Sequence, residues 1–202
     1  IYGDSNVWGD KGFGENGVPL GRYAAKQQWP NILQQLLGDE YDIIQAGLCG
    51  RTAGEYAEQT PYLGGKIGYE IALREASPVE GVIIALGVND ASHKRVPDEQ
   101  IVADLQWYST YTRAYAADSE NDMASGGSVW YIAPAIAPVQ RYKPLASKLH
   151  CINEKLRTTH TTISNPLDEN DDYAPDGIHF SQHGHQRIAQ AIYKAIKEGV
   201  AR

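Results

Sequence analysis

The chain has 202 residues, of which 42% are hydrophobic, and a formal net charge of -7 at pH 7. That apolar content excludes a mostly disordered chain and predicts a single domain with a sizeable core. Tight binding to nucleic acid or to an anionic membrane needs concentrated positive charge, so we expect neither partner. The longest apolar run, residues 82–88, is far shorter than the roughly 20 residues of a membrane span.

Short β-rich runs alternate along the chain with stretches of helical period. The sequence predicts strands at residues 1–2, 41–45, 82–86 and 128–133, and a less marked one at residues 161–163. The run at residues 82–86 is apolar throughout, which is typical of a central strand covered on both faces.

Between these strands, apolar residues recur three and four positions apart, as on one face of a helix. The first such stretch has Pro30 near its start and Gly38 just past its end, which are common start and stop residues of helices. The predicted helices are at residues 29–37, 66–75, 101–115, 145–156 and 188–196. Repeated strand–helix units predict one α/β domain over residues 1–202, with helices on both faces of a parallel sheet.

In parallel sheets of this kind, ligands bind beyond the carboxyl ends of the strands. Ser5 follows the first predicted strand, Gly47 the second and Asn89 the third, while Asp176 and His179 lie in the loop before the last helix. These residue types supply the parts that ester hydrolysis needs.

A serine hydroxyl becomes a good nucleophile when a histidine base, oriented by a carboxylate, accepts its proton. We assign these roles to Ser5, His179 and Asp176, with Asp171 and Asp172 as alternative carboxylates in the same loop. The competing interpretation is a helix-capping serine and a solvated loop histidine without catalytic function.

The tetrahedral intermediate also needs hydrogen-bond donors aimed at its oxyanion. The backbone N–H groups of Ser5 and Gly47 and the side-chain amide of Asn89 are the candidate donors, although Gly47 and Asn89 also suit ordinary turns. We interpret Asp4 and Asp90 as structural carboxylates that bind backbone N–H groups.

Four motifs in order, GDS, an isolated glycine, GxND and DxxH, resemble those of the SGNH (GDSL-like) hydrolase family. The fuller segments GDSNVWG, QQW, GLCGRT and DGIHF resemble its bacterial arylesterase/acyltransferase branch, and the likeness runs from Gly3 to the last helix. It implies a three-layer α/β/α, flavodoxin-like fold with about five parallel strands. It also implies an acyl-enzyme mechanism that uses no metal or cofactor. The resemblance implies that Ser5, Asp176 and His179 form the triad, and it is compatible with a homo-oligomer.

Two positions depart from that pattern, because Val7 stands where the branch usually has Thr and Cys49 where it often has Asn. Because of these two departures, the resemblance does not determine which acyl group the enzyme prefers or how fast it reacts. We expect Cys49 and Cys151 to be reduced, with Cys151 on the buried face of its helix.

Two further residues are candidates for substrate binding. Trp8 lies three positions after Ser5 and is expected to line the acyl or alcohol pocket. Arg51 could clamp an anionic group of a substrate, although an internal ion pair is the favoured interpretation.

The predicted function is a serine esterase for short, acetyl-like esters of aryl, alkyl or sugar alcohols, with acyl transfer as a side activity. One alternative is a metal-dependent hydrolase that uses His179, His183 and His185. Ser181 looks like the N-cap of the last helix, which would place His179 off its face and argues against that site. A second alternative is a non-catalytic binding module on the same fold.

The start of the chain is unusually close to the first motif. Only Ile1 and Tyr2 precede Gly3, whereas a central strand usually has about five residues. We therefore expect the native chain to begin earlier, and we expect a cytoplasmic location.

Overall fold

The computed structural model describes residues 1–56, 60–117, 128–137, 139–168 and 170–198. Within these ranges one parallel sheet has five strands in the order β2-β1-β3-β4-β5. The strands are β1 (Tyr2–Gly3), β2 (Ala46–Gly47), β3 (Gly81–Ala85), β4 (Ser128–Ile132) and β5 (Thr162–Ile163). This sheet confirms the predicted fold class, including the less marked fifth strand.

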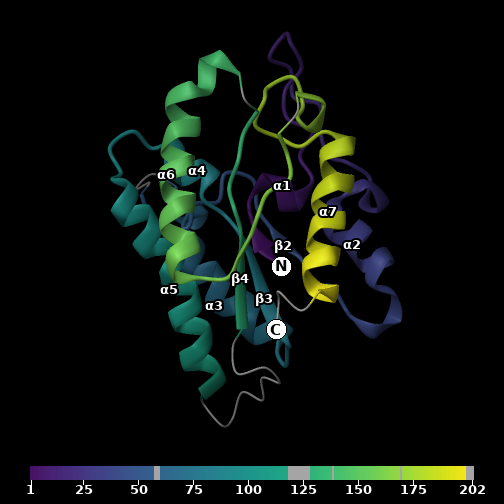
Figure 1. The fold of residues 1–202 in the computed structure, drawn as a ribbon, viewed down its shortest axis with the longest axis vertical. Coiled ribbons are helices and arrows are strands. Elements are labelled where there is room, and N and C mark those ends of the chain that lie inside the picture. Colours follow the sequence, from purple (N-terminus) through teal and green to yellow (C-terminus); the bar gives the residue numbers. More distant parts are fainter. Residues whose placement is uncertain (57–59, 118–127, 138, 169, 199–202) are drawn as a thin grey trace.

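Helices cover both faces of the sheet, with α5 and α6 on one side and α2 and α7 on the other (Figure 1). The α-helices are α1 (Ser5–Trp8), α2 (Trp29–Leu37), α3 (Gly65–Ala76), α4 (Val88–Ser92), α5 (Asp98–Ala117), α6 (Lys143–Thr159) and α7 (Gln182–Lys197). The five predicted helices correspond to α2, α3, α5, α6 and α7. The short helices α1 and α4 were not predicted, because four or five residues give no helical period to detect.

The core has two parts, because successive residues of a strand face opposite sides of the sheet. Ile84 of β3 and Tyr131 of β4 pack with residues of α3, α5 and α6. Their neighbours Ile83 and Ile132 pack with residues of α2 and α7. Each strand therefore contributes to both layers, which explains why the β3 segment is apolar throughout.

The predicted strand at residues 41–45 is wrong, since β2 begins only at Ala46. The sheet register pairs Tyr2 with Ala46, and residues 41–45 belong to no strand. The Ile1 amine donates to the Ile44 carbonyl at 2.7 Å, and the Ile43 N–H donates to the Gln34 side chain instead of a neighbouring strand.

The register brings the ends of three strands together. Gly3 lies beside Gly47 on one side and beside Ala85 on the other, so the segments that follow β1, β2 and β3 meet at one edge of the sheet. No helix in the described ranges is long and apolar enough to span a membrane. Cys49 and Cys151 are free thiols, and Cys151 is half-buried on α6 and not on its fully buried face as expected.

Candidate active site

Ser5 is the first residue of α1 and directly follows β1 through Asp4. Asp4 is extended and caps the helix, since its carboxylate accepts the Asn6 N–H at 2.9 Å. Burial raises the pKa of Asp4 to about 6, although the hydrogen bond from the Asn6 N–H acts to lower it. The first N–H groups of a helix have no partner within it, so the Ser5 N–H is free of intrahelical bonding.

A cleft of about 270 Å³ opens beside Ser5. Three of the predicted site residues, Ser5, Asn89 and His179, line it together. The other lining residues are Asp4, Asn6, Asp10, Phe13, Cys49, Gly50, Val88 and Ile178. Residues from both ends of the chain and from its middle thus meet at one cleft.

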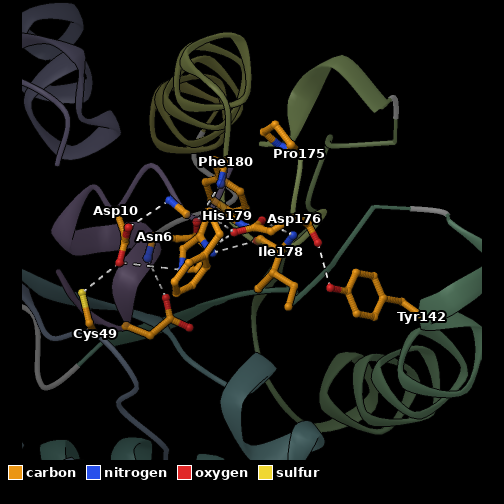
Figure 2. Close-up of polar contacts among 12 residues, drawn as sticks. Asn6, Asp10, Cys49, Tyr142, Pro175, Asp176, Ile178, His179 and Phe180 are labelled. Atoms are coloured by element: carbon orange, nitrogen blue, oxygen red, sulfur yellow. Dashed lines mark hydrogen bonds and ion pairs between the residues drawn. The ribbon is translucent and has the colours of Figure 1, made fainter. Parts of the chain in front are cut away.

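Asp176 binds the imidazole of His179 directly, with 2.7 Å between Oδ2 and Nδ1 (Figure 2). Its Oδ1 accepts the backbone N–H groups of Ile178 and His179 at 2.9 and 3.0 Å, and Oδ2 also accepts the Phe13 N–H at 3.0 Å. Burial alone would raise the pKa of Asp176, but these hydrogen bonds outweigh burial and lower it to about 2. Asp176 is therefore a carboxylate at neutral pH.

Asp171 and Asp172, the alternative carboxylate partners for His179, lie in contact with other groups. Asp172 is fully buried and forms an ion pair with Arg187, and Nδ1 of His183 lies 3.2 Å from Oδ1 of Asp172. Asp171 lies in the same 3-10 turn, η5 (Asn170–Asp172), and its backbone carbonyl accepts the Ser181 hydroxyl. Of the three candidates, Asp176 is the one bonded to His179.

The surroundings of His179 favour its protonated form. Burial would lower the pKa of His179, but the hydrogen bond to Asp176 and the negative charges of Asp176, Asp10 and Asp4 outweigh burial and raise it. An imidazole with this environment is a stronger base than a free one.

Gly47 lies at the end of β2 against the backbone of α1. A Cβ at this position would lie 2.3 Å from the backbone nitrogen of Trp8, so a side chain here would push α1 away. The Asn89 amide donates one hydrogen to the Arg51 carbonyl at 3.0 Å. Because that nitrogen carries two hydrogens, the Arg51 carbonyl orients the amide and leaves a second donor for an oxyanion.

The structure places the two predicted substrate-binding residues outside the lining of the cleft. Arg51 donates to the backbone carbonyls of Gly3 and Ala46, and its guanidinium lies 4.0 Å from the ring centre of Tyr2. These contacts stabilise the strand ends, and they replace the internal ion pair that the sequence favoured. The Trp8 ring lies under the guanidinium of Arg22, 4.5 Å away.

The three histidines of the metal-site alternative have separate surroundings. His185 is buried, its Nδ1 accepts the Trp29 N–H at 3.2 Å, and burial lowers its pKa to about 3. His183 pairs with Asp172, and His179 with Asp176. Among the described residues, no three His, Cys, Asp or Glu side chains are grouped so that they could hold a metal ion.

The family model for the GDSL-like lipase/acylhydrolase family matches residues 1–187. The chain belongs to this family. Membership makes the protein a carboxylic ester hydrolase, in agreement with the resemblance that the four motifs carry. A comparison with curated proteins finds no match.

Solved structures of other esterases share the fold of this GDSL-like hydrolase. A carbohydrate acetylesterase from Sinorhizobium meliloti is 24% identical with a TM-score of 0.81, covering 98% of this chain and 96% of that one. An aryl esterase from M. smegmatis is 23% identical with a TM-score of 0.81 and the same coverage, 98% and 96%. An acetylxylan esterase from Geobacillus stearothermophilus is 18% identical with a TM-score of 0.65, covering 100% and 94%.

The two residues that depart from the family pattern, Val7 and Cys49, have different surroundings in this GDSL-like hydrolase. Val7 is fully buried in the core shared with α2 and α7. Cys49 lines the cleft, and its thiol donates to Asp10 at 3.4 Å. Burial and this carboxylate raise the pKa of Cys49 to about 12, so the group is a neutral thiol at neutral pH.

Sequence reasoning missed the segment that follows α1 in this hydrolase, residues 10–13. Asp10 Oδ2 lies 4.0 Å from Nε2 of His179, and the Phe13 ring meets the imidazole edge-on at 6.4 Å between centres. A Cβ at Gly12 would lie 2.0 Å from Oδ2 of Asp176. No spacing in the glycine-rich sequence GDKGFGENG points to the histidine, which lies 160 or more positions away.

Proposed function

We propose that this GDSL-like hydrolase is a serine esterase that cleaves short, acetyl-like esters of aryl, alkyl or sugar alcohols through an acyl-enzyme. The observation that carries the proposal is that His179, bonded to Asp176 at 2.7 Å, lines the same cleft as Ser5, which stands at a helix N-terminus. The names of the similar structures, carbohydrate acetylesterase and aryl esterase, support the acetyl group and two of the alcohol classes.

In the first half of the reaction, Nε2 of His179 accepts the hydroxyl proton of Ser5 while Oγ attacks the ester carbonyl. The imidazolium that forms is stabilised by the ionised Asp176 at Nδ1. The carbonyl oxygen becomes an oxyanion, for which the N–H groups of Ser5 and Gly47 and the Asn89 amide are the donors. The intermediate then expels the alcohol, which receives its proton from His179.

In the second half, His179 takes a proton from water, and the water oxygen attacks the acyl group on Ser5. The serine leaves with the proton that His179 returns, and the carboxylic acid is released. An alcohol in place of water would receive the acyl group by the same steps, which is the acyl-transfer side activity.

The size of the cleft supports a small acyl group. At about 270 Å³ it lies just below the usual range of small-molecule pockets, roughly 300–1,000 Å³. A p-nitrophenyl ester series from acetyl to palmitoyl tests this part of the proposal. We expect kcat/KM to fall with chain length, and a rise beyond octanoyl would contradict it.

The decisive test compares wild type with Ser5→Ala in the hydrolysis of p-nitrophenyl acetate. We expect a loss of about 10⁴-fold or more in kcat, and covalent labelling of wild type, but not of the variant, by an organophosphonate. Ser147→Ala, on the exposed side of α6, is the matched control and should be as active as wild type. Full activity in Ser5→Ala, or loss of wild-type activity in EDTA, would overturn the proposal.

A further inference from the structure

The imidazole of His179 lies between two carboxylates (Figure 2). Asp176 is 2.7 Å from Nδ1, and Oδ2 of Asp10 is 4.0 Å from Nε2 on the other side of the ring. The Asp10 side chain is 25% exposed and that of His179 12%, so water screens this approach only in part. The triad chemistry accounts for Asp176 and leaves Asp10 without a role.

Asp10 is held in this position by the backbone around Ser5. Its N–H donates to the Ser5 carbonyl at 3.0 Å, and its Oδ1 accepts the Gly12 N–H at 2.9 Å. Its Oδ2 accepts the Cys49 thiol at 3.4 Å. The carboxylate is therefore fixed relative to both Ser5 and His179.

The other charged and titratable groups around His179 come from several elements. Asp176 lies in the same loop, Asp4 directly follows β1, and His185 lies on α7. Burial keeps His185 neutral at neutral pH. The neutral Cys49 thiol lies beyond Asp10. Arg141, from η4 (Gln140–Tyr142), donates to the backbone carbonyls of Pro175 and Asp176.

Within this arrangement, Asp10 is the carboxylate that lies on the Nε2 side. A neutral imidazole interacts weakly with a nearby charge, whereas the imidazolium of the transition state is attracted to it. An interaction that is stronger in the transition state than in the ground state accelerates the reaction.

We propose that Asp10 is a positioning residue that acts through His179, as a second carboxylate that stabilises the imidazolium formed when Ser5 loses its proton. The role rests on the proposed esterase function. Its proton balance is that of the triad: the proton moves from Ser5 to Nε2 and on to the leaving alcohol, and Asp10 takes no part in the transfer.

The test compares Asp10→Asn with wild type, with Asp10→Glu as the variant that keeps the charge. An asparagine can still accept the Gly12 N–H, so the turn at residues 10–12 is retained. Asp39→Asn, an exposed carboxylate in η2 (Gly38–Glu40), is the control for net charge. The measurements are kcat and KM against pH with p-nitrophenyl acetate and phenyl acetate, and an NMR titration of the His179 ring.

We expect Asp10→Asn to lower the pH midpoint of the His179 titration and to reduce kcat about 10-fold at high pH, with KM nearly unchanged for both esters. Asp10→Glu should restore part of the rate, and Asp39→Asn should match wild type. An unchanged His179 midpoint in Asp10→Asn would overturn the proposal. So would an effect confined to the KM of one ester, which would make Asp10 a substrate contact.

The titration separates this proposal from the esterase assignment. A lowered His179 midpoint would support the Asp10–His179 interaction even if Ser5→Ala showed that Ser5 is not the nucleophile. An unchanged midpoint in an enzyme that loses activity in Ser5→Ala would reject the role of Asp10 alone.

Discussion

The side-chain oxygen of Asn6 accepts a hydrogen bond from the backbone N–H of Phe180 at 2.9 Å, across 174 positions of sequence. Its amide nitrogen also approaches the Ile178 carbonyl at 3.4 Å. Asn6 directly follows Ser5, and His179 lies between its two partners, so one buried side chain connects the proposed nucleophile to the proposed base.

Replacing Asn6 with Ala should therefore separate the His179 loop from α1. We expect kcat to fall about 10- to 100-fold with a smaller change in KM, because a displacement of about 1 Å from the reactive geometry can cost about 100-fold. Steady-state kinetics with p-nitrophenyl acetate measure the effect. The control is Asn153→Ala, which removes the hydrogen bond from Asn153 of α6 to the Pro134 carbonyl. Equal kcat in both variants would contradict the role of Asn6.

Gly12 and Gly17 provide a matched pair for the loop after α1. Both have positive φ, +71° and +75°, but a Cβ at Gly12 would lie 2.0 Å from Asp176 Oδ2 and 2.9 Å from His179 Nδ1, whereas one at Gly17 meets nothing within 4 Å. The two alanine variants thus share the backbone strain of about 1–2 kcal/mol. Only the Gly12 variant also collides with Asp176 and His179.

We expect Gly12→Ala to lose about 100-fold or more in kcat, because its methyl group displaces Asp176 from His179. Gly17→Ala should keep near wild-type kcat with a small loss of thermal stability. Thermal unfolding and kinetics of both variants check this. Similar kinetics in the two would mean that backbone strain, and not the contact with Asp176 and His179, determines the outcome.

Much of this arrangement could be predicted from the sequence. The parallel α/β sheet followed from alternating strand and helix patterns, and the family followed from four motifs in the expected order. The grouping of Ser5 and Asn89 at one cleft followed from the rule that parallel strands end at the same edge, and the place of His179 in that cleft was expected from the chemistry that a serine nucleophile needs.

Long-range contacts were not predictable, because periodicity reports only on neighbours along the chain. Asn6 lies in a helix that was not predicted, and nothing local indicates that its amide binds the backbone on both sides of His179. Asp10 and Gly12 lie in a turn-rich loop whose path across the site depends on tertiary packing. Residues 41–45 have a strand-like pattern, but the Gln34 side chain binds the Tyr41 carbonyl and the Ile43 N–H, and no local pattern indicates these contacts.

The Asn89 amide is the side-chain donor of the proposed oxyanion hole. Asn89→Ala should reduce kcat about 100- to 1,000-fold with little change in KM, because the lost hydrogen bond forms fully only in the transition state. Asn89→Asp should be at least as impaired, since it places a negative charge beside the developing oxyanion. Steady-state kinetics test both variants, and a loss confined to KM would show that Asn89 binds substrate in the ground state instead.

The pH dependence of kcat/KM should reflect the titration of His179. The base must be neutral to accept the Ser5 proton, and its carboxylate neighbours outweigh burial and raise the pKa of His179 above the ordinary 6.5. Activity should therefore rise with pH through a midpoint above 6.5, the upper side of the range of about 6–7 expected for an unperturbed histidine.

Asp176 should add no second step to this profile, because its pKa of about 2 keeps it ionised over the whole range in which the enzyme is folded and assayed. Asp176→Asn removes the largest charge that favours the imidazolium, so its midpoint should move to lower pH while kcat falls by several orders of magnitude. Rates measured from pH 5 to 9 at constant ionic strength test both statements. A flat wild-type profile, or a midpoint that rises in Asp176→Asn, would contradict the assignment of His179 as the base that Asp176 orients.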